Sequence, residues 1–149
     1  MIILMKDIDL KQKIKVGLVQ INNSFSNQNY FPYSVGLLQA HVQKHAQAPD
    51  EYEFLLPLYK RIPVEAAAQH LLKADVVGFS VYVWNIRISL AIAKTLKRLK
   101  PNILTVFGGP QVPDHAEQFL RENRFIDVAC HGEGEQVFLS VLEKYSSKD

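Results

Sequence analysis

Two aromatic side chains and an amide follow a buried apolar run near the middle of the chain. The run is Asp-Val-Val-Gly-Phe-Ser over residues 75–80, and Tyr82, Trp84 and Asn85 come directly after it. Aromatic rings supply flat apolar contact area and an amide supplies hydrogen bonds, which together suit the binding of a ligand. Ligands of open parallel sheets lie beyond the carboxyl ends of the strands. Residues 80–85 are therefore predicted to form a wall of a binding site.

Three further segments carry unusual residues, and each follows a predicted strand. The first is an uncharged, amide-rich loop over residues 22–33, which includes Asn22 and Asn23. The others are Gly108-Gly109-Pro110 and the run from His131 to Glu135. A connection as long as residues 22–33 exceeds the usual length of about two to six residues between strand and helix, which favours a functional loop. We expect all four segments to converge on one cavity.

Alternating strands and helices must position these segments. Apolar runs predict strands over residues 14–21, 52–58, 75–80, 103–107 and 126–130. Helical spacing predicts helices over residues 64–73, 86–100, 113–122 and 135–145, and one more that begins at a capping Ser34. This alternation favours a parallel sheet covered by helices on both faces. The predicted fold class is α/β: a three-layer, Rossmann-like (flavodoxin-like), doubly wound sheet of five parallel strands in the order 2-1-3-4-5, with a crevice between the first and third strands.

The composition argues against several classes of protein. A chain of 149 residues fits one domain, here predicted as residues 14–149 with an N-terminal arm over residues 1–13. Its net charge of +2 is too small to indicate binding to nucleic acid or to a membrane surface. The single cysteine, Cys130, excludes a disulfide framework, a thiolate zinc site and a cysteine-ligated cluster within the chain. The apolar start is too short for a signal peptide or a membrane span, so a cytoplasmic location is expected.

Familiar ligand-binding motifs of such sheets are missing from the sequence. The turn after the first strand, Gln20 to Phe25, holds no glycine, whereas a dinucleotide site needs a Gly-x-Gly-x-x-Gly turn there. There is no Walker loop and no cluster of carboxylates at the ends of the first and third strands. The serines also lack a nucleophile elbow with ordered histidine and acid partners. No catalytic residue and no metal ligand is predicted.

Four of these segments together resemble a known family. Phe31–Leu38, Gly78–Asn85, Phe107–Pro110 and Asp127 with His131–Glu135 follow one another as in the amino-terminal cobalamin-binding domain of radical SAM enzymes. The resemblance covers residues 15–145. It implies a domain that holds cobalamin over the strand ends and presents it to a barrel with a [4Fe-4S] cluster and SAM. Many such enzymes are methyltransferases, and others form rings or catalyse other rearrangements.

The resemblance also implies roles for individual residues. Small residues at strand ends would admit the nucleotide tail of cobalamin, namely Gly78, Ser80, Gly108 and Gly109, with Pro110 beside them. Side chains beneath the corrin would be Tyr82, Trp84 and Asn85, and those that meet its amide arms would be Asn22, Asn23 and Tyr33. The cavity rim and a helix start would come from Gly132, Glu133, Gly134 and Glu135.

Two absences refine this expectation. No histidine lies between Gln20 and Gly36, where the cobalamin module of mutases and methionine synthase carries its cobalt ligand, so the lower cobalt face is expected to lack a protein imidazole. The chain has one cysteine, whereas a radical SAM cluster needs three at Cys-x-x-x-Cys-x-x-Cys spacing. The catalytic barrel is therefore expected outside this chain, in a longer polypeptide or in a separate subunit.

Structural interpretations of the same residues stay open. Tyr82 and Trp84 could simply pack under a loop, and the glycine-proline pair could only end a strand. Glu133 and Glu135 could do no more than favour a helix N-terminus, and His131 fits a surface or capping role better than that of a cobalt ligand. The other histidines fit solvated positions, and Cys130 fits a small buried apolar residue. The whole domain could instead bind another ligand or a partner protein, with cobalamin binding lost.

Overall fold

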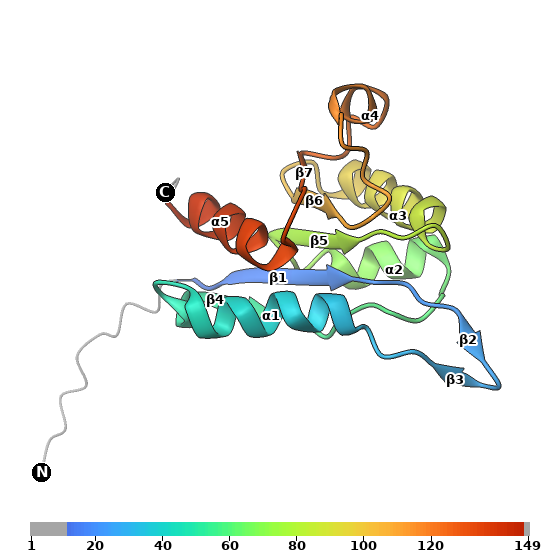
Figure 1. Ribbon diagram of the computed structural model, residues 1–149, viewed down its shortest axis with the longest axis horizontal. Helices are drawn as coiled ribbons and strands as arrows, with labels where there is room; N and C mark the ends of the chain where they lie inside the picture. Colours follow the sequence, from blue (N-terminus) through green and yellow to red (C-terminus); the bar gives the residue numbers. More distant parts are fainter. Residues whose placement is uncertain (1–11, 148–149) are drawn as a thin grey trace, which may run out of the picture.

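A five-stranded parallel sheet forms the centre of the protein, as seen in a computed structural model that describes residues 12–147 (Figure 1). Its strands are β1 (Ile14–Val19), β4 (Tyr52–Phe54), β5 (Val76–Ser80), β6 (Leu104–Gly108) and β7 (Val128–Ala129), in the order β4-β1-β5-β6-β7. Counted among these five strands alone, that order is 2-1-3-4-5, so the prediction is confirmed. The predicted N-terminal arm lies, except for residues 12 and 13, outside the described residues.

Strand β5 is central because both of its edges are paired. Val76 lies opposite Val16 of β1 and Leu104 of β6, and all five residues of β5 are buried. A strand covered on both faces needs apolar side chains at every position, not only at alternate ones. This is why an unbroken apolar run in the sequence identified it.

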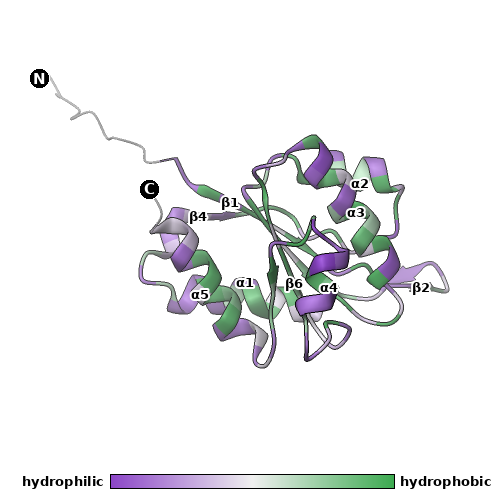
Figure 2. Ribbon diagram, turned by 90° about the horizontal axis from the view of Figure 1, so that it is seen from above, coloured by the Kyte–Doolittle hydropathy of each residue, from purple (hydrophilic) through white to green (hydrophobic). Residues whose placement is uncertain are grey.

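Helices cover both faces of the sheet (Figure 2). One face is covered by α1 (Tyr33–His45) and α5 (Gly134–Ser146), and the other by α2 (Val64–Leu71) and α3 (Ile86–Leu99). Two separate apolar clusters result: Val35 and Phe138 pack with β1 on the first face, and Leu71 and Ile92 pack on the second. The three-layer architecture is therefore as predicted. The short α4 (Glu117–Glu122) and a 3-10 turn, η1 (Pro49–Glu51), complete the described helices.

Several element boundaries differ from the predictions. The strand expected over residues 52–58 ends at Phe54, because Pro57 has no amide hydrogen for the ladder, and pairing resumes only at a bridge between Leu58 and Val19. The helix expected from residue 113 begins at Glu117, and the last strand covers only residues 128–129. Within residues 12–147, no helix is long and apolar enough to cross a membrane.

The amide-rich loop contains a hairpin that was not predicted. Strands β2 (Ser24–Phe25) and β3 (Gln28–Asn29) pair antiparallel and project beyond the end of β1 (Figure 1). Ser26 and Asn27 form its turn with φ values of 49° and 62°. The loop is thus ordered by its own backbone pairing.

Candidate functional site

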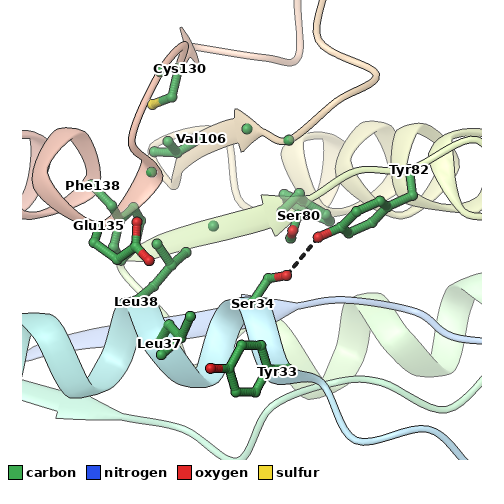
Figure 3. Close-up of a pocket in the computed structure, with 16 residues that line it drawn as sticks. Tyr33, Ser34, Leu37, Leu38, Ser80, Tyr82, Val106, Cys130, Glu135 and Phe138 are labelled. Carbon is green, nitrogen blue, oxygen red and sulfur yellow. Dashed lines mark hydrogen bonds between the residues drawn. The ribbon is translucent and has the colours of Figure 1, made fainter.

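A cavity of about 290 Å³ lies between α1 and α5, at the carboxyl ends of β5 and β6 (Figure 3). We call it the main cavity. All four predicted segments contribute to it, and the predicted residues that line it are Tyr33, Gly78, Ser80, Tyr82, Gly108, Gly109, Gly132, Gly134 and Glu135. The lining also includes seven residues that were not predicted: Ser34, Leu37, Leu38, Phe79, Val106, Cys130 and Phe138. The amide-rich loop contributes only Tyr33, which is the first residue of α1, so the expected convergence on one cavity is met in part.

The cavity lies one strand further along the sheet than expected. Its strand residues come from β5 and β6 and none comes from β1, whereas the crevice was predicted between the first and third strands. The physical reason is the packing of α1. Val35 and Val42 of this helix lie against Val16 and Leu18, which closes the face over β1. The open space is left over β5 and β6, between α1 and α5.

Glycines shape the cavity in different ways. A Cβ built on Gly78 would lie 2.9 Å from Cε2 of Phe138, so this glycine makes room for the phenylalanine ring that lines the cavity. Gly109 has a φ of 107°, and a Cβ there would lie 2.7 Å from the carbonyl oxygen of Val81. At Gly132 a Cβ would meet nothing within 4 Å, and at Gly108 it would meet only Cβ of Cys130 at 3.6 Å. Space beside these last two glycines is open.

Three hydroxyl groups lie in the same part of the main cavity (Figure 3). Oγ of Ser34 and Oη of Tyr82 are 2.6 Å apart and hydrogen-bonded, which joins α1 to the loop after β5. Ser80 is 7% exposed, and its hydroxyl has no hydrogen-bond partner within residues 12–147. Ser80 therefore offers a free donor and acceptor to a ligand.

The predicted cap of α1 is wrong. Ser34 lies inside the helix and its hydroxyl bonds Tyr82 instead of the helix backbone. The backbone N–H of Val35 donates to Oε1 of Gln20 at 3.2 Å. The start of α1 is thus satisfied by a side chain 15 residues earlier in the chain, which local sequence could not indicate.

The lining of the main cavity is nearly neutral. Among the described residues that line it, Glu135 carries a carboxylate and the others are apolar, hydroxylic or glycine, apart from the thiol of Cys130. Burial raises the pKa of the Cys130 thiol to about 11, so this group is protonated near neutral pH. Cys130 is only half-buried and lines the cavity, where it adds a small, neutral side chain.

Asn85 faces neither the main cavity nor solvent. Its side chain is fully buried, and its Nδ2 donates to the carbonyl oxygens of Ile21 at 3.0 Å and Ser80 at 3.1 Å. Its Oδ1 accepts the backbone N–H of Tyr82 at 2.8 Å. These bonds tie the end of the β1 segment to the end of β5, so Asn85 holds the site in shape.

A second cavity, of about 340 Å³, lies beyond the carboxyl end of β1. It is lined by Gln20, Asn22, Asn23, Tyr30, Phe31 and Trp84, and we call it the amide cavity. The rings of Tyr82 and Trp84 stack with centroids 4.6 Å apart and planes 7° apart. Because Tyr82 lines the main cavity and Trp84 the amide cavity, this stack joins the two. Asn22, Asn23 and Trp84 are therefore placed apart from the nine predicted residues of the main cavity.

The remaining predicted residues lie elsewhere. Glu133 lines an open depression of about 650 Å³ with His41, Lys44 and His45, and Pro110 is exposed and lines none of the three cavities. His131 is exposed and lines none of them either. His41 was expected to be solvated, but its Nε2 is buried without a hydrogen-bond partner within residues 12–147. The same part of the chain holds no group of three side chains placed to bind a metal ion.

Similar proteins include enzymes whose names refer to cobalamin or to methyl transfer. The chain is 36% identical over 113 residues to the cobalamin-dependent radical SAM methyltransferase TokK of Streptomyces tokunonensis. It is 34% identical to the 2-(S-pantetheinyl)-carbapenam-3-carboxylate methyltransferase of Streptantibioticus cattleyicolor, again over 76% of the chain. It is also 28% identical over 65% of its length to the anaerobic magnesium-protoporphyrin IX monomethyl ester cyclase of Cereibacter sphaeroides.

The matched region is a small part of each relative. It covers 17% of the length of the first two enzymes and 16% of the third. The model of the B12 binding domain matches residues 15–142, which takes in the five strands of the sheet except for Ile14 and all but the end of α5. The motifs, the fold and this match agree, and the chain belongs to the B12-binding domain family.

Proposed function

We propose that this chain binds cobalamin and serves as the cofactor domain of a radical SAM methyltransferase. The observation that carries the proposal is the main cavity, a nearly neutral space at the carboxyl ends of β5 and β6 with an unpaired hydroxyl, that of Ser80, inside it. The names of the two methyltransferases to which the chain is similar support the reaction class. The radical SAM barrel, with its [4Fe-4S] cluster and SAM, would belong to the same polypeptide or to a separate subunit.

The chemistry of the main cavity fits the nucleotide tail of cobalamin. Pockets that bury a drug-sized ligand have volumes of about 300–1,000 Å³, so about 290 Å³ suits one part of so large a cofactor. The lining of Leu38, Val106 and Phe138 suits the flat apolar base of the tail, and Ser80 can hydrogen-bond a polar atom of it. The open space beside Gly108 and Gly132 leaves room at the mouth. The corrin would then lie outside, over the strand ends.

Bound cobalamin would supply a cobalt ion that can carry a methyl group. The residues of this chain would hold and orient the cofactor and shield one side of it. Tyr82 and Trp84 present stacked rings at the strand ends, and Trp84 remains partly exposed there. No histidine within residues 12–147 lines the main cavity, so we expect no protein imidazole on the lower cobalt face.

Retention of hydroxocobalamin tests the proposal. The purified chain is mixed with hydroxocobalamin and desalted, and the visible spectrum of the protein fraction is recorded. We expect retained colour in the unaltered chain and its loss in Ser80→Leu, because the larger side chain would fill the main cavity. Ser140→Leu makes the same change on an exposed position of α5, and it should retain the cofactor.

One result would overturn the proposal, and two others would overturn the assignment of the cofactor to the main cavity. No retained colour in the unaltered chain would favour a domain that binds another ligand or a partner protein. Retention by Ser80→Leu equal to that of the unaltered chain would move the site elsewhere. Loss in both leucine variants would mean that the change acts through the fold and not through the cavity.

A further inference from the structure

The amide cavity contains two buried side-chain amides, and each is only half satisfied. Gln20 and Asn22 are each 6% exposed, and both line this cavity. Neither unused end is among the fully buried polar atoms without a partner in residues 12–147. Both ends are therefore open to the amide cavity and available to a ligand.

Gln20 has an unused donor. Its Oε1 accepts the backbone N–H of Val35 at 3.2 Å, which fixes the orientation of the side-chain amide. Its Nε2 has no hydrogen-bond partner within residues 12–147. The side chain is thus anchored to the start of α1 through its oxygen, and its NH2 group is left for a ligand.

Asn22 has an unused acceptor. Its Nδ2 donates to the carbonyl oxygen of Tyr30 at 3.3 Å, which fixes this amide in turn. Its Oδ1 has no partner in the described part of the chain. One cavity therefore offers a donor from Gln20 and an acceptor from Asn22, both on side chains that are already held in place.

A primary carboxamide matches this pair of groups. Its carbonyl oxygen can accept from Nε2 of Gln20, and its NH2 group can donate to Oδ1 of Asn22. A carboxylate matches less well, because it has no hydrogen to donate and would leave Oδ1 facing another acceptor. No charged side chain of the described residues lines the cavity. Arg61 approaches from outside, where its guanidinium donates to Oδ1 of Asn23 at 3.3 Å and to the carbonyl oxygen of Trp84 at 2.9 Å.

The walls of the amide cavity suit the apolar stem of such a group. Tyr30, Phe31 and Trp84 line it, and all three are exposed enough to contact a ligand. The stack of Trp84 on Tyr82 connects it to the main cavity. A ligand held in the main cavity by one end can therefore reach the amide cavity with another.

We propose that the amide cavity binds a primary carboxamide, and that one of the amide side arms of the corrin supplies it. This inference rests on the proposed function, since it assumes that cobalamin is the ligand. It adds that Gln20 and Asn22 select an amidated corrinoid over one in which the same arm ends in a carboxylate.

The test compares ligands on the unaltered chain, so no variant needs to fold. Hydroxocobalamin is titrated beside the cobalamin monocarboxylates, in each of which one propionamide has been hydrolysed to the acid. Trp84 is the chain's single tryptophan and lines the amide cavity, so its quenched fluorescence reports binding. We expect one monocarboxylate to bind about tenfold more weakly or worse, from the loss of one satisfied amide pair.

A substitution then assigns the effect to Gln20. Gln20→Glu keeps an oxygen for the N–H of Val35, and a negative charge is favourable at a helix N-terminus, so the fold should persist. It replaces the Nε2 donor by an acceptor, and we expect about tenfold weaker binding of hydroxocobalamin. Gln69→Glu makes the same change on the exposed side of α2 and should leave the affinity unaltered.

The results separate this inference from the proposed function. If the unaltered chain binds hydroxocobalamin and all monocarboxylates equally, the amide assignment is overturned and the proposed function stands. Unaltered affinity of Gln20→Glu for hydroxocobalamin would also overturn the amide assignment alone. If hydroxocobalamin does not bind the unaltered chain at all, the proposed function fails and the amide assignment fails with it.

Discussion

Replacing Asn85 by alanine removes three hydrogen bonds from the point where the ends of β1 and β5 meet. The lost partners are the carbonyl oxygens of Ile21 and Ser80 and the backbone N–H of Tyr82, at 3.0, 3.1 and 2.8 Å. The Asn85 side chain is fully buried, so water has no direct access to replace it. The substitution should therefore weaken the fold at the loop that forms the wall between the two cavities.

The size of the effect follows from the three bonds. A buried hydrogen bond contributes a net of about 1 kcal/mol, so their loss should lower the free energy of unfolding by about 3 kcal/mol. For a chain of this size, each kcal/mol shifts the melting temperature by about 2–4 °C, which gives a decrease of about 6–12 °C. Asn85→Asp should lose at least as much despite its similar shape, because its second oxygen would face the carbonyl groups of Ile21 and Ser80.

Urea unfolding followed by far-UV circular dichroism measures the loss. Asn123→Ala is the matched control, because Nδ2 of Asn123 makes one local bond, to the carbonyl oxygen of Phe119 at 2.8 Å, and its removal should cost about 1 kcal/mol. If Asn85→Ala is no more destabilised than this control, the hydrogen bonds of Asn85 do not stabilise the junction between the ends of β1 and β5. Milder destabilisation of Asn85→Asp than of Asn85→Ala would contradict the orientation of the amide.

Further predictions concern three residues around the main cavity. Gly109→Ala should lower the free energy of unfolding by about 1–3 kcal/mol in a urea titration, because φ is 107° and the new Cβ would lie 2.7 Å from the oxygen of Val81. Cys130 should react slowly with iodoacetamide at pH 8 and faster as the pH rises toward 11, since burial raises its thiol pKa to about 11. The same raised pKa should lower the free energy of unfolding between pH 9 and pH 11, because the unfolded chain loses this proton first, and Cys130→Ala should lack that component. Tyr82→Phe removes the 2.6 Å bond to Ser34 but keeps the ring on Trp84, so it should cost about 0.5–1.5 kcal/mol and leave the tryptophan emission maximum unchanged.

The fold could be predicted because the apolar composition of its central strands indicates that they are buried on both faces. The run Val76–Ser80 is buried at every position, and such a short apolar run with β-branched residues is typical of a strand in the middle of a parallel sheet. Right-handed crossovers then leave few strand orders, and the observed one was among them. The bounds of the edge strands were harder to predict. Strand β7 pairs at only two positions, so little in its sequence indicates where pairing begins or ends.

The hairpin of β2 and β3 escaped prediction for a local reason. Its turn residues Ser26 and Asn27 both have positive φ, which is typical of Asn-Gly or Gly-rich turns and uncommon for serine. Only two residues on each side pair, and all four are exposed. Neither alternation of apolar residues nor a glycine turn was present to indicate it.

The site was predictable where residues follow strands and not where they come from helices. Ser80, Gly108 and Gly132 were found because the carboxyl ends of parallel strands share one edge of the sheet. Leu38 and Phe138 line the main cavity from the inner faces of α1 and α5. The apolar residues of those faces predict only that the helices pack against the sheet. The separation of Trp84 from Tyr82 into two cavities depends on packing between distant segments, which spacing along the chain cannot reveal.

The loop between β5 and α3 is held at three points, and this bears on the kind of ligand that the two cavities suit. Asn85 binds the backbone of Tyr82, Ser34 of α1 binds the Tyr82 hydroxyl, and Arg61 binds the carbonyl oxygen of Trp84 from the segment after β4. With the loop fixed, the distance between the main cavity and the amide cavity is fixed as well. A rigid ligand with two suitable groups gains from such preorganised sites, because little conformational freedom is lost on binding. A flexible ligand would lose more, so a ligand whose two bound groups are held at a fixed spacing would bind here most tightly.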